Sequence, residues 1–366
     1  MPVSVGRITL HMGPSSLGAP DDLEQAIVDF IGGAKSKLDI AIQELESERI
    51  AQAIIAAKQR KIRVRLALEG DYLRASPPRR NPFQPVPKTR KRRGNEPNRE
   101  LFAALLRAGI DSRTDYNSKI FHQKFIVRDS GDDRCVLTGS TNFTPTGTDG
   151  NFNHVVVIED PDVALEYGRE FTQLWRGTFG RHSFDHARQP KEIDVSGVRV
   201  KPLFAPDHGP EMEIMKQMLK ARRRIDFAIF TFSNSSGIDD VMVKLLGSDP
   251  RVAIKGVMDG PMGGQKWAPT KPLADKGADL KLIDKGLQVA GHKVNKLHHK
   301  LMVIDEQLII VGSFNYTGPA NNFNDENILI IGDLDSTDQT SIDRQKKLAR
   351  YALDDVNRIH AVGRTP

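Results

Sequence analysis

Short stretches in which apolar residues alternate with polar ones, or run together, recur along the whole chain. The clearest of these stretches lie at 7–14, 35–42, 62–70, 198–207, 222–229 and 252–260. Their length and period predict β-strands. Three segments, 20–36, 48–61 and 98–110, instead place apolar residues every three or four positions, which predicts helices. Strands separated by helices predict an α/β sandwich in each half of the chain.

The chain carries one sequence pattern twice. HQKFIVRD at 122–129 has the spacing H-x-K-x4-D, and HHKLMVID at 298–305 repeats it. After each motif, a second apolar strand ends in Gly-Ser, and the following residues align without gaps. The aligned pairs are Ser140 with Ser313, Asn142 with Asn315, and Asn153 with Glu326. A repeat of half the chain indicates domain duplication, because solenoid repeats are typically only about 20 to 50 residues long.

The duplication predicts two domains of similar size. We expect the first to span 1–185 with the motif at 122–129, and the second to span 195–366 with the motif at 298–305. The segment 181–197 is polar and rich in turn-forming residues, so we place the linker there. A chain of 366 residues is long enough to bury a sizeable apolar core in each half.

Composition narrows the class of protein. The lone Cys135 excludes an internal disulfide and a cysteine metal cluster. No segment approaches the roughly 18 uncharged apolar residues of a membrane span, and the start of the chain lacks a basic segment followed by an apolar one. We therefore expect a cytoplasmic protein without stable membrane insertion. The net charge of +6 favours an anionic partner.

The two H-x-K-x4-D motifs, each followed by G-S-x-N, resemble the phospholipase D superfamily over nearly the whole chain. The resemblance implies two tandem α-β-α sandwich domains related by a pseudo-twofold axis, with the active site at their interface. Because both motifs lie in one polypeptide, a monomer can form a complete site. The sequence does not decide whether the chain also forms a homo-oligomer.

The residue types suit a phosphodiester substrate. Positions i and i+2 of a strand share a face, so His122 with Lys124, and His298 with Lys300, point the same way. An imidazole can attack phosphorus or transfer a proton, while ammonium, hydroxyl and amide groups stabilise charge on the phosphate oxygens. The residues that we expect to contact phosphate are Ser140, Asn142, Asn153, Ser313 and Asn315.

The family resemblance also implies a phosphohistidine intermediate. The two halves differ at the position whose side chain would contact the motif histidine of the opposite half. Glu326 is a carboxylate that would reach the histidine of the opposite half, whereas its counterpart is the neutral Asn153. A carboxylate fixes the tautomer of an imidazole and stabilises its charged form. We therefore predict that His122 is the nucleophile and His298 the general acid and base.

We expect the other ionisable residues near the motifs to have structural roles. Asp129 and Asp305 end their strands, and we expect them to support the site through hydrogen bonds to backbone. His154, His292 and His299 are expected to be structural. Zinc usually requires three or four ligands from Cys, His and carboxylate side chains, and each motif has a lysine instead. We therefore predict neither a required metal nor another cofactor.

Two lysine- and arginine-rich segments, between Asp71 and Glu100 and at 261–296, are predicted to form loops at the rim of the site. Such loops can neutralise backbone phosphates, and Tyr72, Phe83 and Trp267 can stack on unpaired bases. The cations and the aromatic residue predicted to bind nucleic acid are Arg79, Arg80, Lys88, Arg90, Lys91, Arg92, Arg93, Lys266 and Trp267.

These segments favour a nuclease that acts on DNA or RNA. A phospholipase D-type phospholipid hydrolase or transphosphatidylase is the alternative, although neither segment has the large apolar stripe of a membrane-seeking helix. A third hypothesis is a nucleic-acid-binding protein that has lost turnover. All six motif residues are intact, so this third hypothesis is the least favoured.

Overall fold

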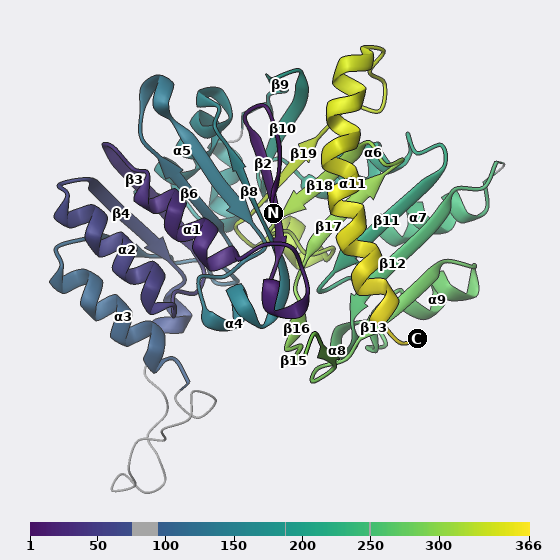
Figure 1. The fold of residues 1–366 in the computed structure, drawn as a ribbon, viewed down its shortest axis with the longest axis horizontal. Coiled ribbons are helices and arrows are strands. Elements are labelled where there is room, and N and C mark those ends of the chain that lie inside the picture. Colours follow the sequence, from purple (N-terminus) through teal and green to yellow (C-terminus); the bar gives the residue numbers. More distant parts are fainter. Residues whose placement is uncertain (75–93, 187, 249) are drawn as a thin grey trace, which may run out of the picture.

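A computed structural model describes residues 1–74, 94–186, 188–248 and 250–366 (Figure 1). Two mixed β-sheets lie side by side, and helices cover them (Figure 1). No helix in the described part of the chain combines the length and apolar character needed to cross a bilayer.

The strands of the two sheets follow the same order. Among the described residues, the first sheet runs β1 (Val3–Val5), β2 (Ile8–Gly13), β8 (Asn151–Ile158), β7 (Cys135–Gly139), β6 (Lys124–Arg128), β3 (Lys37–Ile42), β4 (Arg63–Leu68) and β5 (Asp111–Thr114), with β16 (Lys296–Leu297) beside β8. The second runs β9 (Ile193–Val195), β10 (Val198–Ala205), β19 (Glu326–Ile331), β18 (Leu308–Gly312), β17 (Lys300–Ile304), β11 (Arg224–Ile229), β12 (Ala253–Asp259) and β13 (Asp279–Ile283). This correspondence confirms the predicted duplicated α/β fold.

The helices form layers around the two sheets. Those of the first half are α1 (Leu23–Gly32), α2 (Glu48–Gln59), α3 (Glu96–Arg107), α4 (Pro145–Asp149) and α5 (Pro161–Arg176). Those of the second half are α6 (Pro210–Met218), α7 (Ile238–Leu246), α8 (Gly260–Gly263), α9 (Thr270–Asp275), α10 (Gly318–Asn322) and α11 (Gln339–Val362). α1 and α2 pack on one face of the first sheet, and α6 and α7 pack on one face of the second.

The inner faces of both sheets share one apolar core. Tyr167 and Phe171 of α5 and Val356 of α11 are buried in this core together with strand residues of both halves. Burial of apolar area is the main stabilising contribution of such an interface. The two halves are therefore packed through a continuous interior.

Two short segments are exchanged between the halves, and each leads into a motif histidine. β16 pairs with β8 of the first sheet, and the His298 backbone N–H donates to Phe152 O at 2.9 Å. In the same way, the His122 N–H donates to Asp325 O at 2.9 Å, beside the start of β19. Backbone pairing thus fixes each histidine against the opposite half.

Two predicted irregular segments contain strands. The last part of the predicted linker forms β9, which pairs with β10. The segment 261–296 contains β13, whose Leu280 and Leu282 are buried, as well as α9 and a hairpin of β14 (Gln288–Val289) and β15 (His292–Lys293). The alternation in DLKLI at 279–283 was the overlooked signal, because period two marks a strand even when lysines surround it.

Candidate active site

The two motif histidines lie together at the junction of the two halves. Both line a cavity of about 630 Å³, and their ring centroids are 6.5 Å apart with the ring planes at 68°. Both side chains are buried except for the part that borders this cavity. The structure therefore brings together two residues that are far apart in the sequence.

A carboxylate holds the His122 ring. His122 Nδ1 lies 2.6 Å from Oε2 of the fully buried Glu326. Ser313 Oγ donates to the same oxygen at 2.7 Å, and Asn324 Nδ2 donates to Oε1 at 3.3 Å. A carboxylate only accepts, so Nδ1 carries a proton and the lone pair of a neutral His122 is on Nε2.

Neutral oxygens hold the His298 ring. His298 Nδ1 lies 3.0 Å from Asn153 Oδ1 and 3.1 Å from the carbonyl oxygen of Ser140. Ser140 Oγ donates to the same Asn153 oxygen at 2.7 Å, and Asn153 Nδ2 donates to Gly147 O at 2.8 Å. The two histidines thus share one geometry but have neighbours of different charge.

Both motif lysines are buried beside their histidines. Lys124 Nζ donates to His122 O at 2.9 Å and to Gln43 Oε1 at 3.1 Å. Lys300 Nζ donates to His298 O at 2.9 Å. Burial lowers the pKa of Lys124 to about 7. Burial, and then repulsion by Lys124, hold the pKa of Lys300 well below its usual value.

Burial also acts on the histidines. It lowers the pKa of His122 to about 4, against the opposing attraction of Glu326. Burial and the positive charges of Lys300 and Lys124 hold the pKa of His298 well below its usual value. Without substrate, both imidazoles are therefore neutral at pH 7. An anionic phosphodiester would raise all four pKa values, because its negative charge favours the positively charged form of each group.

The residues predicted to contact phosphate occupy two positions. Asn142 and Asn315 line the cavity, and among the described residues their Oδ1 atoms have no hydrogen-bond partner. Ser140, Ser313 and Asn153 instead lie behind the histidines and contact them or their partners. The structure thus separates residues open to substrate from residues that orient the imidazoles.

The two motif aspartates lie at the far ends of their strands. Asp129 Oδ1 accepts from the backbone N–H groups of Lys35 and Ser36 at 2.8 and 2.7 Å. Asp305 accepts in the same manner from the backbone of Arg222, Arg223 and Arg224 at 2.7 to 2.9 Å. These contacts join the strand after each motif histidine to the start of the neighbouring strand.

The rim of the cavity contains part of the predicted nucleic-acid-binding set. Tyr72 and Trp267 line the cavity, and Lys266 is exposed beside Trp267. Phe83 and the cations Arg79, Arg80, Lys88, Arg90, Lys91, Arg92 and Arg93 lie outside the described residues.

Sequence reasoning missed several residues of the cavity wall, among them Gln43, Phe230, Lys119 and Lys296. Gln43 follows β3 and Phe230 follows the equivalent strand β11, so extending the alignment of the two halves by one residue would have found this pair. The Phe230 ring lies 4.9 Å from that of His298. Lys296 Nζ lies 5.1 Å from the Phe230 ring.

His154 and His299 lie outside the cavity. They stack at 5.4 Å with nearly parallel rings, and His299 Nε2 lies 3.1 Å from Asp355 Oδ2. Within the described residues, no three His, Cys, Asp or Glu side chains are grouped so as to hold a metal ion.

The duplicated sheets and the paired His–Lys site define a fold and site of the phospholipase D type. The family model described as "Cardiolipin synthase, PLD-like domain" matches residues 27–175 and 214–344. This match covers more than half of the chain, and the chain belongs to that family. The resemblance to the phospholipase D superfamily is thereby confirmed.

The curated relatives with names match only part of this chain, at low sequence identity. A mitochondrial cardiolipin hydrolase of Xenopus laevis is 27% identical over 143 residues, which are 39% of this chain and 56% of the relative. A phospholipase D of Rickettsia conorii is 29% identical over 143 residues, which are 38% of this chain and 64% of the relative. The chain thus spans about half the length of the curated relatives it matches.

Among solved structures, the phosphatidylserine synthase of Haemophilus influenzae superposes with a TM-score of 0.63 at 14% identity. The superposition covers 98% of this chain and 87% of that chain. The similarity shows that both chains have the same fold.

Proposed function

We propose that the protein is a metal-independent phosphodiesterase that cleaves nucleic acid through a covalent intermediate on His122. The observation that carries the proposal is the pair of imidazoles that face each other across one cavity, one backed by Glu326 and the other by Asn153. A nucleophile needs a free lone pair, and a neutral His122 with its proton on Nδ1 has that lone pair on Nε2.

In the first step, His122 Nε2 attacks phosphorus and the bond from phosphorus to the leaving oxygen breaks. The His122 ring becomes positively charged, and Glu326 at 2.6 Å stabilises this charge. His298, protonated on Nε2 when the phosphate is bound, gives its proton to the leaving oxygen. In the second step, His298 takes a proton from water, the water oxygen attacks phosphorus, and His122 is released.

The charge on the equatorial oxygens requires donors close to phosphorus. Lys124, Lys300 and the Nδ2 groups of Asn142 and Asn315 are suited to this task, because the lysines lie beside the histidines and the amides line the cavity. Their action is strong in a cavity with little water. No step in this scheme requires a metal ion.

The rim supports a nucleic-acid substrate. Trp267 is 38% exposed, and both it and Tyr72 line the cavity, where an aromatic ring can stack on an unpaired base. Lys119 and Lys296 line the same cavity and can neutralise neighbouring phosphates. Base stacking together with cations is typical of binding to single-stranded nucleic acid.

One observation favours phospholipid as a second candidate substrate. Ile120 and Trp267 both line the cavity and are 42% and 38% exposed, and exposed apolar residues of this kind can also contact acyl chains. The names of the relatives refer to cardiolipin and phospholipid.

Parallel assays of the purified protein in the presence of a chelator test both candidates. Labelled single-stranded DNA, duplex DNA and RNA are compared with vesicles of phosphatidylglycerol or cardiolipin, and His122→Ala is the control. We expect the wild type to cleave nucleic acid and the variant to be inactive. Release of lipid headgroup without nucleic-acid cleavage would reverse the proposal, and loss of activity on chelation with recovery on adding a divalent ion would refute the metal-independent mechanism.

A further inference from the structure

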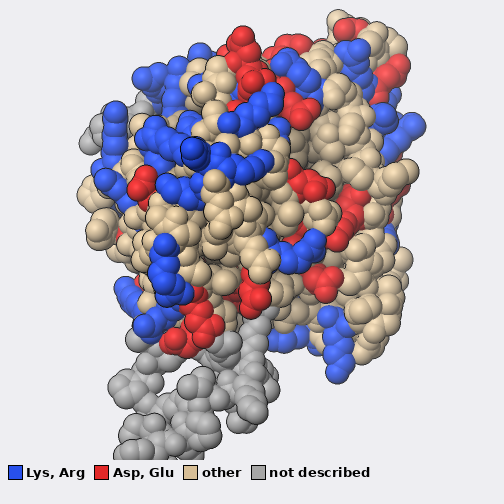
Figure 2. Space-filling model, turned by 60° about the vertical axis from the view of Figure 1, so that its left-hand side comes forward, with Lys and Arg blue, Asp and Glu red and all other residues tan. Residues whose placement is uncertain are grey.

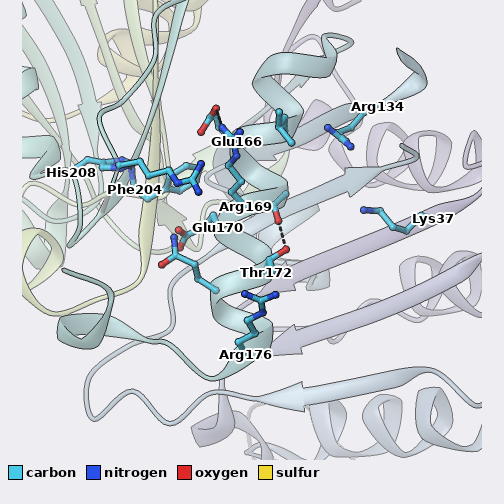
Figure 3. A pocket seen from close by; sticks show the side chains of 13 residues that line it. Lys37, Arg134, Glu166, Arg169, Glu170, Thr172, Arg176, Phe204 and His208 are labelled. Atoms are coloured by element: carbon cyan, nitrogen blue, oxygen red, sulfur yellow. Dashed lines mark hydrogen bonds and ion pairs between the residues drawn. The ribbon is translucent and has the colours of Figure 1, made fainter. Parts of the chain in front are cut away.

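A second cavity, of about 440 Å³, lies beside α5 (Figure 3), and neither His122 nor His298 lines it. Lys37 at the start of β3 lines it, whereas Gln43, just after the end of β3, lines the active-site cavity. Six residues of extended strand separate these positions by roughly 20 Å. The second cavity therefore lies toward the opposite end of the first sheet from the proposed site of cleavage.

Cations from four parts of the chain converge on this second cavity. They are Lys37, Arg134, Arg169 and Arg176, which are labelled in Figure 3, and Arg188. Lys37 pairs with Asp39 at 2.8 Å, and Arg169 pairs with Glu166. Arg134, Arg176 and Arg188 have no acidic partner in the part of the chain that the structure describes. Three positive charges are thus available to a ligand.

The inner wall adds neutral hydrogen-bond donors. His208 Nδ1 accepts from the Phe204 backbone N–H at 3.0 Å, so its proton is on Nε2. Burial holds the pKa of Glu170 well above its usual value, which favours the neutral carboxyl group, a hydrogen-bond donor. Arginines together with neutral donors are well suited to phosphate oxygens, because arginine binds phosphate with two parallel hydrogen bonds.

Two of these cations are spaced along one helix, so the positive charge is not confined to a single point. Arg169 and Arg176 are seven residues apart on α5, which corresponds to about 10 Å along the helix axis. Thr172 and Gln173, which also line the cavity, lie between them. Figure 2 shows Lys and Arg side chains gathered in a broad band on the face that the first half of the chain presents. Charges spaced in this way are suited to successive phosphates along a strand better than to one isolated anion.

We propose that the basic cavity beside α5 is a second, non-catalytic binding site for the sugar–phosphate backbone of nucleic acid. The inference rests on the proposed function, because it names a further contact of the same substrate. A strand long enough to reach both cavities is held at two points, which raises its affinity through effective concentration. A short strand in the active-site cavity gains nothing from the second site.

Binding is tested in the His122→Ala background, so that the strand is not cleaved. The triple change Arg134→Gln/Arg176→Gln/Arg188→Gln removes the three free charges. The matched control Lys244→Gln/Lys271→Gln/Lys276→Gln removes the same charge from exposed lysines on or beside α7 and α9. Fluorescence anisotropy measures the affinity for a long and a very short single-stranded oligonucleotide at several salt concentrations, and thermal unfolding verifies that both variants are folded.

We expect the arginine variant to bind the long strand at least about tenfold more weakly and the short strand unchanged. Each lost phosphate contact lowers the slope of log affinity against log salt by about 0.7, so three lost contacts lower it by about 2. The lysine control should retain the slope of the parent. Equal slopes for the parent and the arginine variant would overturn the inference.

Two further outcomes separate this inference from the proposed function. Cleavage of nucleic acid by the wild type, with long-strand binding that does not depend on the three arginines, refutes the second site and leaves the nuclease proposal standing. Arginine-dependent binding of long strands without any cleavage by the wild type supports the second site and refutes the nuclease. Arginine-dependent binding of anionic vesicles, with no binding of oligonucleotide, refutes the second site as proposed.

Discussion

The two halves of the active site have the same geometry and different charge. In the first, a buried carboxylate, Glu326, holds the His122 ring at 2.6 Å. In the second, the amide of Asn153 holds His298 at 3.0 Å, from the aligned position of the other sheet. The fold therefore places two equivalent imidazoles, and in the proposed mechanism one carboxylate-to-amide difference gives them different chemical roles.

The difference continues behind the histidines. On the first side, Asn327 Nδ2 donates to Gln123 Oε1 at 2.7 Å. On the second side, the aligned residues are His154 and His299, whose Nδ1 atoms are 3.1 Å apart. Duplication thus retained buried polar pairs at these positions, but only one pair can titrate. The comparison shows that the shape of an interface can be kept while its electrostatics diverge.

The largest expected effect concerns the two histidines themselves. His122→Ala should lower turnover by about 10⁴-fold or more and abolish the phosphoprotein, because it removes the nucleophile. His298→Ala should lower turnover by about 10²–10⁴-fold, because it removes the acid of the first step and the base of the second, and a p-nitrophenyl phosphodiester, whose leaving group needs no general acid, should let the phosphoprotein accumulate in this variant. Rapid-quench labelling with ³²P substrate checks both, and phosphoprotein that survives His122→Ala would contradict the assignment.

Removing the charge of Glu326 should change turnover far more than introducing a charge at Asn153. Glu326→Gln should lower turnover by roughly 10²-fold or more, because the charged His122 ring loses its counter-charge. Asn153→Asp should change turnover less than about tenfold and move the alkaline limb of the pH–rate profile upward, since a new carboxylate raises the pKa of His298. Comparable losses in the two variants would remove the basis for distinct roles.

We expect the two motif aspartates to contribute equally to stability in the two halves. Asp129→Ala and Asp305→Ala each leave several backbone N–H groups unpaired, so each should lower the free energy of unfolding by about 2–3 kcal/mol. Urea unfolding of the two variants measures this. Strong loss of turnover in either variant at unchanged stability would instead indicate a direct role in the chemistry.

The smallest effect concerns His154 and His299. Burial lowers the pKa of both in the folded chain. The unfolded chain therefore binds protons that the folded chain does not, and stability falls as the pH drops below about 6.5, with a limiting slope of about 1.4 kcal/mol per pH unit for each histidine. The variant His154→Asn/His299→Gln copies the pair of the other side, so its unfolding free energy should vary less between pH 5 and 7. An unchanged slope would show that other groups carry the pH dependence.

Much of the fold and the site was predictable because duplication left the same local signals twice. The strand periodicity around 122–129 and 298–305 and the aligned positions Asn153 and Glu326 are contained in the sequence. The strand β13 was missed because lysines surround its alternating pattern, and Phe230 was missed because its counterpart Gln43 is a residue of another type.

The sequence by itself determined which side chains are present and that each motif sits at the mouth of a buried strand, since these properties depend on local order and periodicity. Only the tertiary structure decided which partners meet. The exchange of β16 onto β8 brings His298 to Asn153, and the cations that line the second cavity come from segments that are distant in sequence. The physical reason is that contacts across an interface depend on how two cores pack together, and no local pattern encodes that packing.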